Sequence, residues 1–372
     1  MASSSQAAVA AAATGPLGAL SHDELGVIFD GLADPLQPVV AVALSSTCKG
    51  LRTPLRVSLE MLKEWHGRVK SLCLKLHMPR VGSGGLDPPV PLECPSVAVA
   101  QRMASHREMN TDSMGTLSML LRGHWVPKLE YLEVPFNGTS CGDAGVQALC
   151  EGLGHGAAPS LRVLNIAGNQ IGPAGAEALA AALSRGAMPK LESLNLFANP
   201  IGKRGVAALA APLRQRAALK GLILRECSLG DEGVDALFDG VVKDDFKALN
   251  TLELDFNMLT ERSCATLVSA IEGGLLPELL VVYATHDATQ QAAVDGAVQR
   301  FRYEPRVEAI LRAEGLDKLS LNIIYGRLEQ AAGMPKDEIR KRRKSIKPII
   351  RRAVDNVLIR TLGPQGGLPP WA

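Results

Sequence analysis

A nine-residue pattern of apolar positions recurs through the middle of the chain. Its copies are LEYLEVPFN from Leu129, LRVLNIAGN from Leu161, LESLNLFAN from Leu191, LKGLILREC from Leu219, LNTLELDFN from Leu249 and LLVVYATHD from Leu279. Their starts lie 28 to 32 residues apart, and a weaker copy, VKSLCLKLH, begins at Val69. A constant period of this kind predicts a solenoid in which each repeat stacks on its neighbours.

Each copy predicts a short strand whose fourth and sixth positions point inward. These positions hold Leu164 and Ile166 in one copy, and Leu194 and Leu196 in the next. Alternate side chains of a strand lie on one face, so these leucines and isoleucines are expected in the core. A glycine turn and an Ala/Leu helix follow each strand, as in residues 171–183. The sequence therefore predicts an α/β fold, a curved solenoid of strand–turn–helix repeats.

The ninth position of the pattern is polar. It carries Asn137, Asn169, Asn199 and Asn257, with Cys227 and Asp287 as variants. An asparagine amide can bond backbone groups of a turn that no strand ladder satisfies. The resulting LxxLxLxxN motif resembles the leucine-rich repeat, and one helix per repeat resembles its ribonuclease-inhibitor-like subclass. This resemblance implies a curved α/β solenoid.

The composition of the flanking segments predicts further parts of the chain. We expect a disordered Ala/Ser-rich tail over 1–19, a helical cap over 20–67, the repeats over 68–300, a basic helical domain over 304–362 and a flexible tail over 363–372. A Pro/Gly-rich stretch predicts a loop insertion over 79–110 in the first repeat. The helix of that repeat is expected to resume over 112–121.

The predicted cap carries Leu25, Ile28 and Phe29 at helical spacing, with Ser21 placed to cap the helix. The order LxxDELxxIFxxL, then Asp-Pro and further apolar helices, resembles an F-box. The resemblance implies that Leu25, Ile28 and Phe29 bind a Skp-type adaptor, which would make the chain a substrate receptor of a ubiquitin ligase. The alternative is a cap that only shields the open end of the solenoid.

The basic domain predicts three amphipathic helices. Val307, Ile310 and Leu311 lie on one face of the first, and Ser320 caps the second. The third is expected to be kinked or split by Pro348, and its apolar stripe consists of Ile339, Ile346, Ile350, Val354 and Val357. The order of these segments resembles the DEK C-terminal domain. This resemblance implies a compact three-helix fold that binds DNA or self-associates.

Positive charge is concentrated in the same domain. The whole chain has a net charge of +2, whereas residues 304–360 hold 14 Lys/Arg against 8 Asp/Glu. Phosphate neutralisation on duplex DNA is the expected use of these cations, and the composition of 340–344 favours a nuclear over a cytoplasmic location. The predicted DNA contacts are Arg340, Lys341, Arg342, Arg343, Lys344, Lys347, Arg351 and Arg352.

Outward positions three, five and seven of the strands are expected on the concave face. Exposed Tyr, Phe and Ile beside Arg are residue types enriched at protein interfaces, so we predict a protein ligand there. The alternative is a surface without a partner. The predicted contacts are Tyr131, Glu133, Asn165, Asn195, Phe197, Ile223, Arg225, Glu253, Asp255 and Tyr283.

Catalytic and metal chemistry find little support in the sequence. Residues 138–142 read GxSxG around Ser140, but the repeat alignment explains this turn without catalysis. The histidines lack metal-ligand spacing, and 7 Cys without a CxxC pair favour a reducing, intracellular compartment. We therefore expect no enzyme, no cofactor, no metal and no membrane span.

The prediction is a protein-binding scaffold or adaptor built on the solenoid. A second hypothesis is a GTPase activator of the Ran type, because the solenoids of those proteins resemble this repeat subclass. The usual acidic tail of that family is replaced here by a basic one, which ranks this hypothesis lower.

Overall fold

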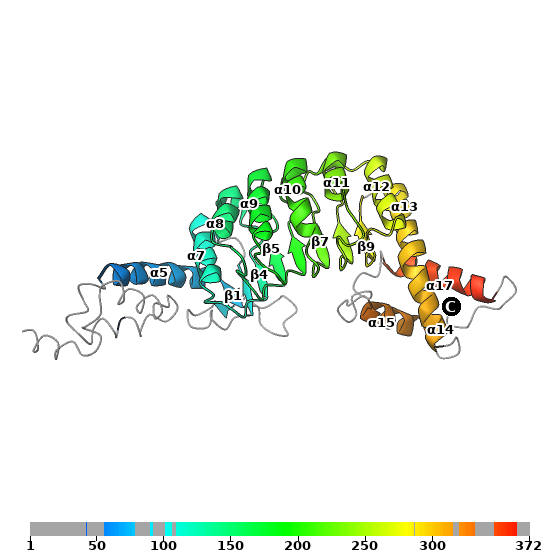
Figure 1. Ribbon diagram of the computed structural model, residues 1–372, viewed down its shortest axis with the longest axis horizontal. Helices are drawn as coiled ribbons and strands as arrows, with labels where there is room; N and C mark the ends of the chain where they lie inside the picture. Colours follow the sequence, from blue (N-terminus) through cyan, green and yellow to red (C-terminus); the bar gives the residue numbers. More distant parts are fainter. Residues whose placement is uncertain are drawn as a thin grey trace, which may run out of the picture.

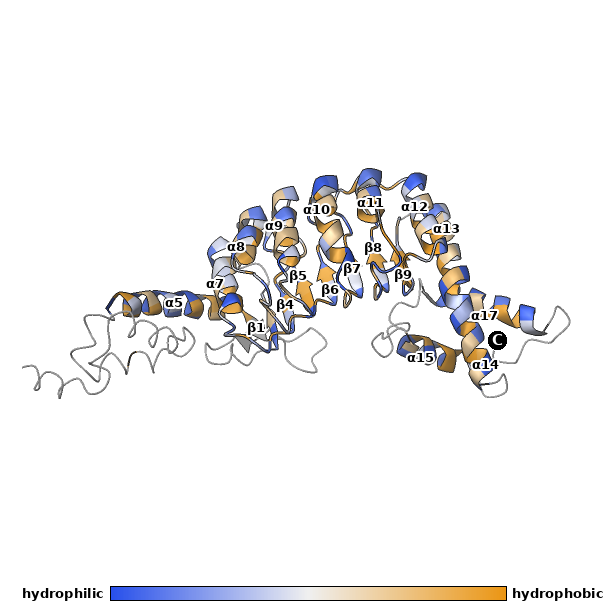
Figure 2. Cartoon of the chain, in the orientation of Figure 1, coloured by the Kyte–Doolittle hydropathy of each residue, from blue (hydrophilic) through white to orange (hydrophobic). Residues whose placement is uncertain are grey.

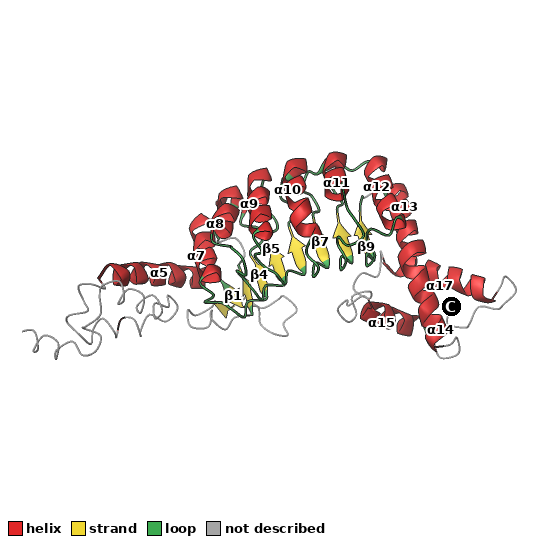
Figure 3. Cartoon of the chain, in the orientation of Figure 1, coloured by secondary structure: helices red, strands yellow, loops and turns green. Residues whose placement is uncertain are grey.

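The computed structural model describes residues 56–78, 90–91, 101–105, 109–285, 287–314, 320–331 and 346–362, together with residue 42. Within them a row of strands lines the inner side of an arc and a row of helices covers its outer side (Figure 1, Figure 3). Helix α5 (Arg56–Lys75) projects from the N-terminal end, and α14 (Glu304–Glu314), α15 (Leu321–Ala331) and α17 (Ile346–Leu362) lie at the C-terminal end (Figure 1).

One sheet runs through the whole arc. Its parallel strands are β3 (Arg102–Ala104), β4 (Tyr131–Glu133), β5 (Val163–Asn165), β6 (Ser193–Asn195), β7 (Gly221–Ile223), β8 (Thr251–Glu253) and β9 (Val281–Tyr283). At the N-terminal edge β1 (His77–Met78) pairs antiparallel with both β2 (Val90–Pro91) and β3. The register aligns equivalent positions, so Leu164 lies between Leu132 and Leu194. The predicted α/β fold, a curved solenoid of strand–turn–helix repeats, is confirmed.

Each parallel strand is followed by a helix on the outer side of the arc. The helices are α7 (Thr111–Arg122), α8 (Gly142–Glu151), α9 (Pro173–Ser184), α10 (Gly202–Arg214), α11 (Gly230–Phe238), α12 (Glu261–Glu272) and α13 (Ala288–Val298). A glycine allows these helices to pack closely. At Gly205, for example, a Cβ would lie 2.9 Å from Cβ of Ala176 on the preceding helix.

The core lies between the strands and the helices. Leu164, Ile166, Leu194 and Leu196 have no exposed surface, as the inward positions predict. Figure 2 shows hydrophobic residues on the sides of the helices that face the strands and hydrophilic residues at their outer ends. One continuous cluster of buried residues runs from Val69 to Leu358, which is how a solenoid buries surface that no single repeat could bury alone.

The asparagines of the ninth position form a hydrogen-bonded ladder. Oδ1 of Asn169 accepts from the backbone N–H of Asn137 at 2.8 Å, and Oδ1 of Asn199 accepts from that of Asn169 at 2.9 Å. The NH2 group of Asn199 donates to the carbonyls of Ile166 and Leu196. These buried bonds join each turn to the next, which confirms the predicted role of these four asparagines.

Two variants of the ninth position behave differently. Cys227 stays in the ladder, with its Sγ 3.2 Å from the carbonyl oxygen of Leu196. Asp287 does not: it is exposed and caps α13 by accepting from the N–H groups of Thr289 and Gln290. Gln291 from α13 replaces it, accepting from Ala284 and donating to the carbonyl of Val282. The prediction for Asp287 was wrong, because a carboxylate cannot donate to the turn carbonyls.

The first repeat also differs from the prediction. Most of the segment starting at Val69, predicted as a weak strand copy, belongs to helix α5 (Arg56–Lys75), and only its last residue, His77, lies in a strand, β1. The strand of that repeat is β3, inside the predicted loop insertion over 79–110. The helix that follows was predicted over 112–121 and is confirmed as α7. The expected boundary between cap and repeats, at 67–68, falls within α5.

The C-terminal helices dock directly on the last repeat. The chain passes from α13 through η3 (Gln299–Tyr303), a π-helical segment, into α14 (Glu304–Glu314). The Tyr303 hydroxyl donates to the carbonyl of Leu280 at 3.0 Å, and Arg302 donates to the carbonyls of Leu276 and Ile271. Together with α15 (Leu321–Ala331) and α17 (Ile346–Leu362), α14 closes this end of the core.

The apolar stripes predicted for these helices face inward. Val307 and Leu311 on α14 are buried, as are Ile350, Val354 and Val357 on α17. The sequence also placed Ser320 at the start of the second helix, and the N–H of Ile323 donates to its hydroxyl at 3.4 Å. Pro348 lies in the first turn of α17, where a helix needs no backbone N–H. Ile339 lies outside the described residues.

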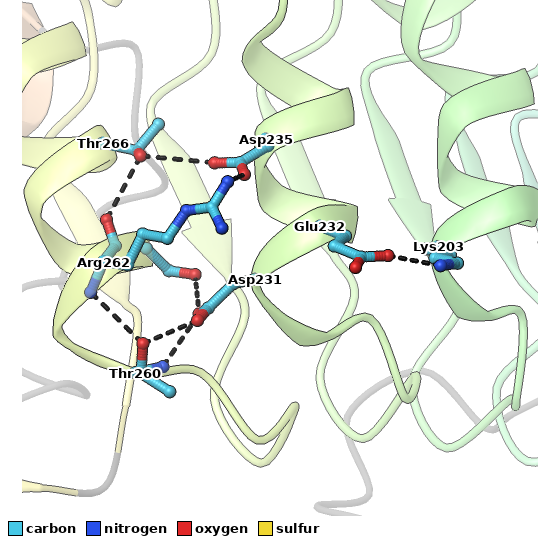
Figure 4. A network of polar contacts seen from close by, with 8 residues as sticks. Lys203, Asp231, Glu232, Asp235, Thr260, Arg262 and Thr266 are labelled. Carbon is cyan, nitrogen blue, oxygen red and sulfur yellow. Dashed lines mark hydrogen bonds and ion pairs between the residues drawn. The ribbon is translucent and has the colours of Figure 1, made fainter.

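Polar side chains join neighbouring helices on the outer side of the arc (Figure 4). Asp231 on α11 accepts from the backbone N–H of Thr260 at 2.9 Å and from its hydroxyl at 2.6 Å. Burial would raise the pKa of Asp231, but hydrogen bonds from Ser263 and Thr260 outweigh it and lower that pKa. In the same network Arg262 pairs with Asp235. These contacts fix the spacing of adjacent repeats.

Candidate protein-binding face

The concave face is formed by the outward side chains of β4 to β9 and of the turns that follow these strands. Tyr131, Glu133, Asn165, Asn195 and Ile223 are half-buried there, as the alternation predicts. Phe197, Arg225, Glu253 and Tyr283 are half-buried on the same side. Asp255 is buried, because it lies under the side chain of Arg225, its ion-pair partner.

Three aromatic rings and one guanidinium form a row across the turns, which we call the rim cluster: Phe136, Phe197, Arg225 and Phe256. The rings of Phe136 and Phe197 meet edge to face with centroids 6.4 Å apart. The Arg225 guanidinium lies 5.8 Å from the Phe197 centroid and 4.8 Å from that of Phe256. Nε of Arg225 is 3.1 Å from Oδ2 of Asp255.

Two members of the rim cluster occupy an unfavourable backbone conformation. Phe136 has φ 59° and Phe256 has φ 60°, in the left-handed region. Glycine occupies the equivalent position in the next repeat, at Gly168, where a Cβ would overlap the Phe136 ring. A bulky residue in the left-handed region costs about 1 kcal/mol or more. Half of each side chain is nevertheless exposed, 50% for Phe136 and 47% for Phe256, so burial offsets only part of this cost.

Asn165 and Asn195 lie side by side at the centre of the concave face. Their Cα atoms are partners in the register of β5 and β6. Oδ1 of each accepts a backbone N–H two residues on, from Ala167 at 3.2 Å and from Phe197 at 2.9 Å. This bond orients each amide and leaves its NH2 group as a donor for a ligand.

Charged side chains lie at the N-terminal end of the concave face and along the second position of the repeats. At the N-terminal end Arg102 pairs with Glu133 at 2.5 Å and lies 5.6 Å from the centroid of the Tyr131 ring. Along the second position of the repeats runs a separate row of ion pairs: Glu130–Arg162 at 3.5 Å, Arg162–Glu192 at 2.7 Å and Glu192–Lys220 at 3.1 Å. The hydrogen bond from Arg162 lowers the pKa of Glu192. These charges are satisfied within the chain.

Sequence reasoning missed Phe136, Phe256 and Met258 on this face. Met258 is 75% exposed and also has positive φ. The prediction took only positions three, five and seven as outward, because it extended strand alternation to the end of each copy. The left-handed turn at positions eight and ten rotates those side chains outward as well. A large apolar residue at position eight, where other copies carry Gly, Ala or a polar residue, was the signal available in the sequence.

The other predicted site residues lie away from this face. On α17, Arg351 is 3.2 Å from Asp355, the Lys347 ammonium lies 5.1 Å from the centroid of the Tyr325 ring, and Arg352 is exposed. The remaining predicted DNA contacts, over 340–344, lie outside the described residues. So do the predicted adaptor contacts Leu25, Ile28 and Phe29.

The GxSxG segment forms a turn between β4 and α8. Ser140 is exposed at the end of η2 (Gly138–Ser140), a single 3-10 turn, and among the described residues no histidine hydrogen-bonds to it. Burial raises the pKa of the neighbouring Cys141 thiol to about 11, which keeps it protonated and unreactive at neutral pH. No group of three or more potential metal ligands is found in the described part of the chain.

Comparison with known proteins supports the repeat assignment. A family model described as Leucine Rich repeat matches residues 157–180 and 187–210, which span two consecutive repeats. No curated protein matches the chain. None of the described helices is long and apolar enough to cross a membrane. The family match, together with the parallel strands and the asparagine ladder, supports a leucine-rich repeat protein.

Proposed function

We propose that this protein is a non-enzymatic scaffold that binds a protein partner on the concave face of its solenoid. The observation that carries the proposal is the rim cluster. Phe136 and Phe256 combine a strained backbone with half-exposed rings, and stability alone does not favour aromatic residues at such positions. Aromatic residues and arginine are the side chains that most often dominate protein interfaces. Leucine-rich repeats are typically protein-interaction modules, which agrees with this reading.

Affinity capture with matched variants tests the proposal. In Phe136→Ala/Phe256→Ala, the bound partners should be lost, while the denaturant midpoint of unfolding should change little because both rings are half-exposed. Val242→Ala is the control: Val242 is 58% exposed in the segment between α11 and β8, outside the rim cluster, so its removal should keep the partners. If both variants capture the same proteins as the wild type, the concave face is not the binding surface.

We also propose that the C-terminal module binds duplex DNA without sequence preference. Lys347 and Arg351 are one helical turn apart on α17, and Arg352 adds an exposed charge beside them. The log of the binding constant should fall with log salt by about 0.9 for each phosphate neutralised. Arg351→Gln/Arg352→Gln in the full chain should make that slope shallower by up to about two units. No binding to random duplex at low salt would leave self-association as the role of this module.

Adaptor binding by Leu25, Ile28 and Phe29 remains a proposal that rests on the F-box resemblance. Leu25→Asp/Phe29→Asp should abolish co-purification of a Skp-type adaptor with the full chain. A chain in which these residues only cap the solenoid would aggregate after the same substitutions and would bind no adaptor before them. The Ran-type GTPase hypothesis has no further support and ranks below both.

A further inference from the structure

The middle of the concave face presents hydrogen-bond donors on neighbouring strands. On β5 and β6, the side-chain oxygens of Asn165 and Asn195 already accept the backbone N–H groups of Ala167 and Phe197. Neither NH2 group makes a hydrogen bond to a described residue, and both side chains are half-buried. Each amide therefore has its oxygen engaged and its NH2 donors available to a ligand.

Arg225 adds a third donor group in the next repeat. Its guanidinium lies over the rings of Phe197 and Phe256, 5.8 and 4.8 Å from their centroids, and its Nε is 3.1 Å from Oδ2 of Asp255. The guanidinium makes no hydrogen bond within the described part of the chain, although 40% of the side chain is exposed. Because two rings and one ion pair hold it in place, its terminal N–H groups are preorganised donors.

The charge around these donors favours a neutral acceptor. The two amides are uncharged, and Asp255 balances the charge of Arg225. The exposed carboxylate of Glu226 follows Arg225 in the chain and disfavours a second anion beside the guanidinium. Lys or Arg side chains of a partner have no acceptor to offer. An uncharged carbonyl oxygen therefore matches this surface better than a carboxylate or a cation does.

An apolar platform lies among the donors. The ring of Phe136 covers Gly168, where a Cβ would overlap that ring, and it meets the Phe197 ring edge to face with centroids 6.4 Å apart. Phe197 has a donor group on either side, since its N–H is bonded to Asn195 and Arg225 lies over its ring. Half of the Phe136 side chain is exposed. An apolar side chain that packs on these two rings therefore has donors beside it.

Resting on the proposed function, we propose that the partner is a protein segment that is extended and uncharged where it crosses β5 to β7. Its backbone carbonyls accept from Asn165, Asn195 and Arg225. One of its apolar side chains packs on the rings of Phe136 and Phe197. A helix uses most of its carbonyls for its own hydrogen bonds, whereas an extended segment keeps them for these donors. The donors bind the backbone of the segment, and the two rings select its side chain.

Selection from a random peptide library displayed on phage, with the full chain as target, tests the partner class. The selected peptides should share an apolar residue and show no enrichment of charged residues beside it. Their affinity should change less than about twofold between about 0.01 and about 0.1 M salt, although the screening length falls from about 30 to about 10 Å. Peptides enriched in Asp or Glu, with an affinity that falls as salt is added, would overturn the proposal.

An isosteric substitution tests the donors directly. Asn165→Asp/Asn195→Asp keeps a side-chain oxygen for the N–H groups of Ala167 and Phe197 and replaces both NH2 groups by oxygens. The affinity for a selected peptide should fall at least about tenfold, because two donors are lost and their positions now repel carbonyl oxygens. The unfolding midpoint should change little, since the local bonds are kept.

A matched control makes the same change in charge away from this face. Asn110 caps α7, and Asn322 lies in the first turn of α15. A carboxylate is favourable at a helix N-terminus, so Asn110→Asp/Asn322→Asp should fold and keep the full peptide affinity. Equal losses in the two double variants would overturn the proposal.

The peptide itself provides a test of the backbone acceptors. Replacing the amide on either side of its apolar residue by an ester weakens one carbonyl acceptor. For at least one of the two positions, the ester should weaken binding to the wild-type chain and have a smaller effect on Asn165→Asp/Asn195→Asp. Ester peptides that bind both chains as well as the parent peptide does would overturn the role of the backbone carbonyls.

The outcomes separate this inference from the proposed function. A peptide that loses binding in Phe136→Ala/Phe256→Ala but keeps it in Asn165→Asp/Asn195→Asp would overturn the donor assignment and keep the concave face as the docking surface. Binding that ignores both variants would overturn both proposals. If the wild-type chain selects no peptide, the extended segment is overturned, while partners captured through the rim cluster would still support the proposed function.

Discussion

The middle repeats and the C-terminal end of the solenoid are held together by different kinds of contact. Between middle repeats the same hydrogen bond recurs with the period of the sequence, from the N–H of Asn137 to Asn169 and from that of Asn169 to Asn199. At the C-terminal end, Tyr303 and Glu304 make contacts that occur once. Repetition makes the first kind of contact visible in a sequence, whereas the second kind has no period to reveal it.

The largest expected loss of stability follows from a substitution in the asparagine ladder. Asn199→Leu removes two bonds accepted from Asn169 and Ile171 and three donated to backbone carbonyls. Each buried group left unpaired costs about 1–3 kcal/mol, so unfolding free energy should fall by about 4 kcal/mol. Chemical denaturation measures this. Asn165→Leu, where the half-exposed side chain accepts one local bond, is the control and should cost far less. Equal losses would show that the ladder has no special role.

The second-largest loss of stability is expected from a substitution at the C-terminal end. Glu304 is buried and accepts from Gln299, from Asn356 at 2.9 Å and from Arg360 at 2.7 Å. Glu304→Gln loses charge-assisted bonds and should destabilise the docking of α17 by about 2 kcal/mol. Hydrogen exchange should accelerate in α17 and stay unchanged in β5 and β6. Glu308→Gln, at an exposed pair with Arg312, should alter neither. Faster exchange throughout the solenoid would contradict a local role for Glu304.

A smaller effect, this time a gain in stability, is expected from placing an asparagine where the ladder lacks one. Burial raises the pKa of the Cys227 thiol to about 12, and this sulfur is a weak hydrogen-bonding partner for the turn. Cys227→Asn should supply a better acceptor for the N–H of Asn199 and stabilise the chain by about 1 kcal/mol. Cys150→Asn, at a buried helix position outside the ladder, should destabilise it. Loss of stability in both variants would show that position 227 is specialised for cysteine.

The smallest effect is pH-dependent and lies at the junction of the two regions. Burial raises the pKa of Asp295 on α13, against a hydrogen bond from Gln291 that lowers it. A raised pKa means that the folded state binds more protons than the unfolded state, so this group's contribution to stability falls as pH rises through the carboxyl range. Asp295→Asn should therefore be slightly more stable than wild type at neutral pH, and the gain should vanish in acid. A gain that persists at low pH would point to packing instead.

The sequence predicted the repeats well where the apolar spacing has a single interpretation. It failed at Val69 because Val69, Leu72, Cys73 and Leu76 are spaced by three or four residues, which fits one face of a helix as well as the repeat pattern. All four are buried: Val69, Leu72 and Cys73 lie on α5, and Leu76 directly follows it. The true strand, β3, was invisible because its inward residue is Met103 and no leucine marks it.

The candidate site was predicted in outline and not in detail. Strand alternation predicted Phe197, Arg225 and Tyr283 on the concave side, and all three are half-buried. It could not show that Asp255 is buried under Arg225, because that depends on two side chains of neighbouring repeats meeting. Nor could it show Phe136 and Phe256, whose outward direction comes from a left-handed turn.

The sequence by itself determined the period, the inward leucines and the asparagine ladder. Each of these is set by residue types that recur at a fixed spacing. One repeat can bury its apolar side chains only against the next repeat, so the spacing also implies the stacking. Only the tertiary structure decided the composition of the concave face. The rim cluster draws Phe136, Phe197, Arg225 and Phe256 from four repeats, and these side chains meet because parallel stacking superimposes the turns. The docking of Tyr303 and Glu304 was likewise decided by contacts between segments that share no pattern.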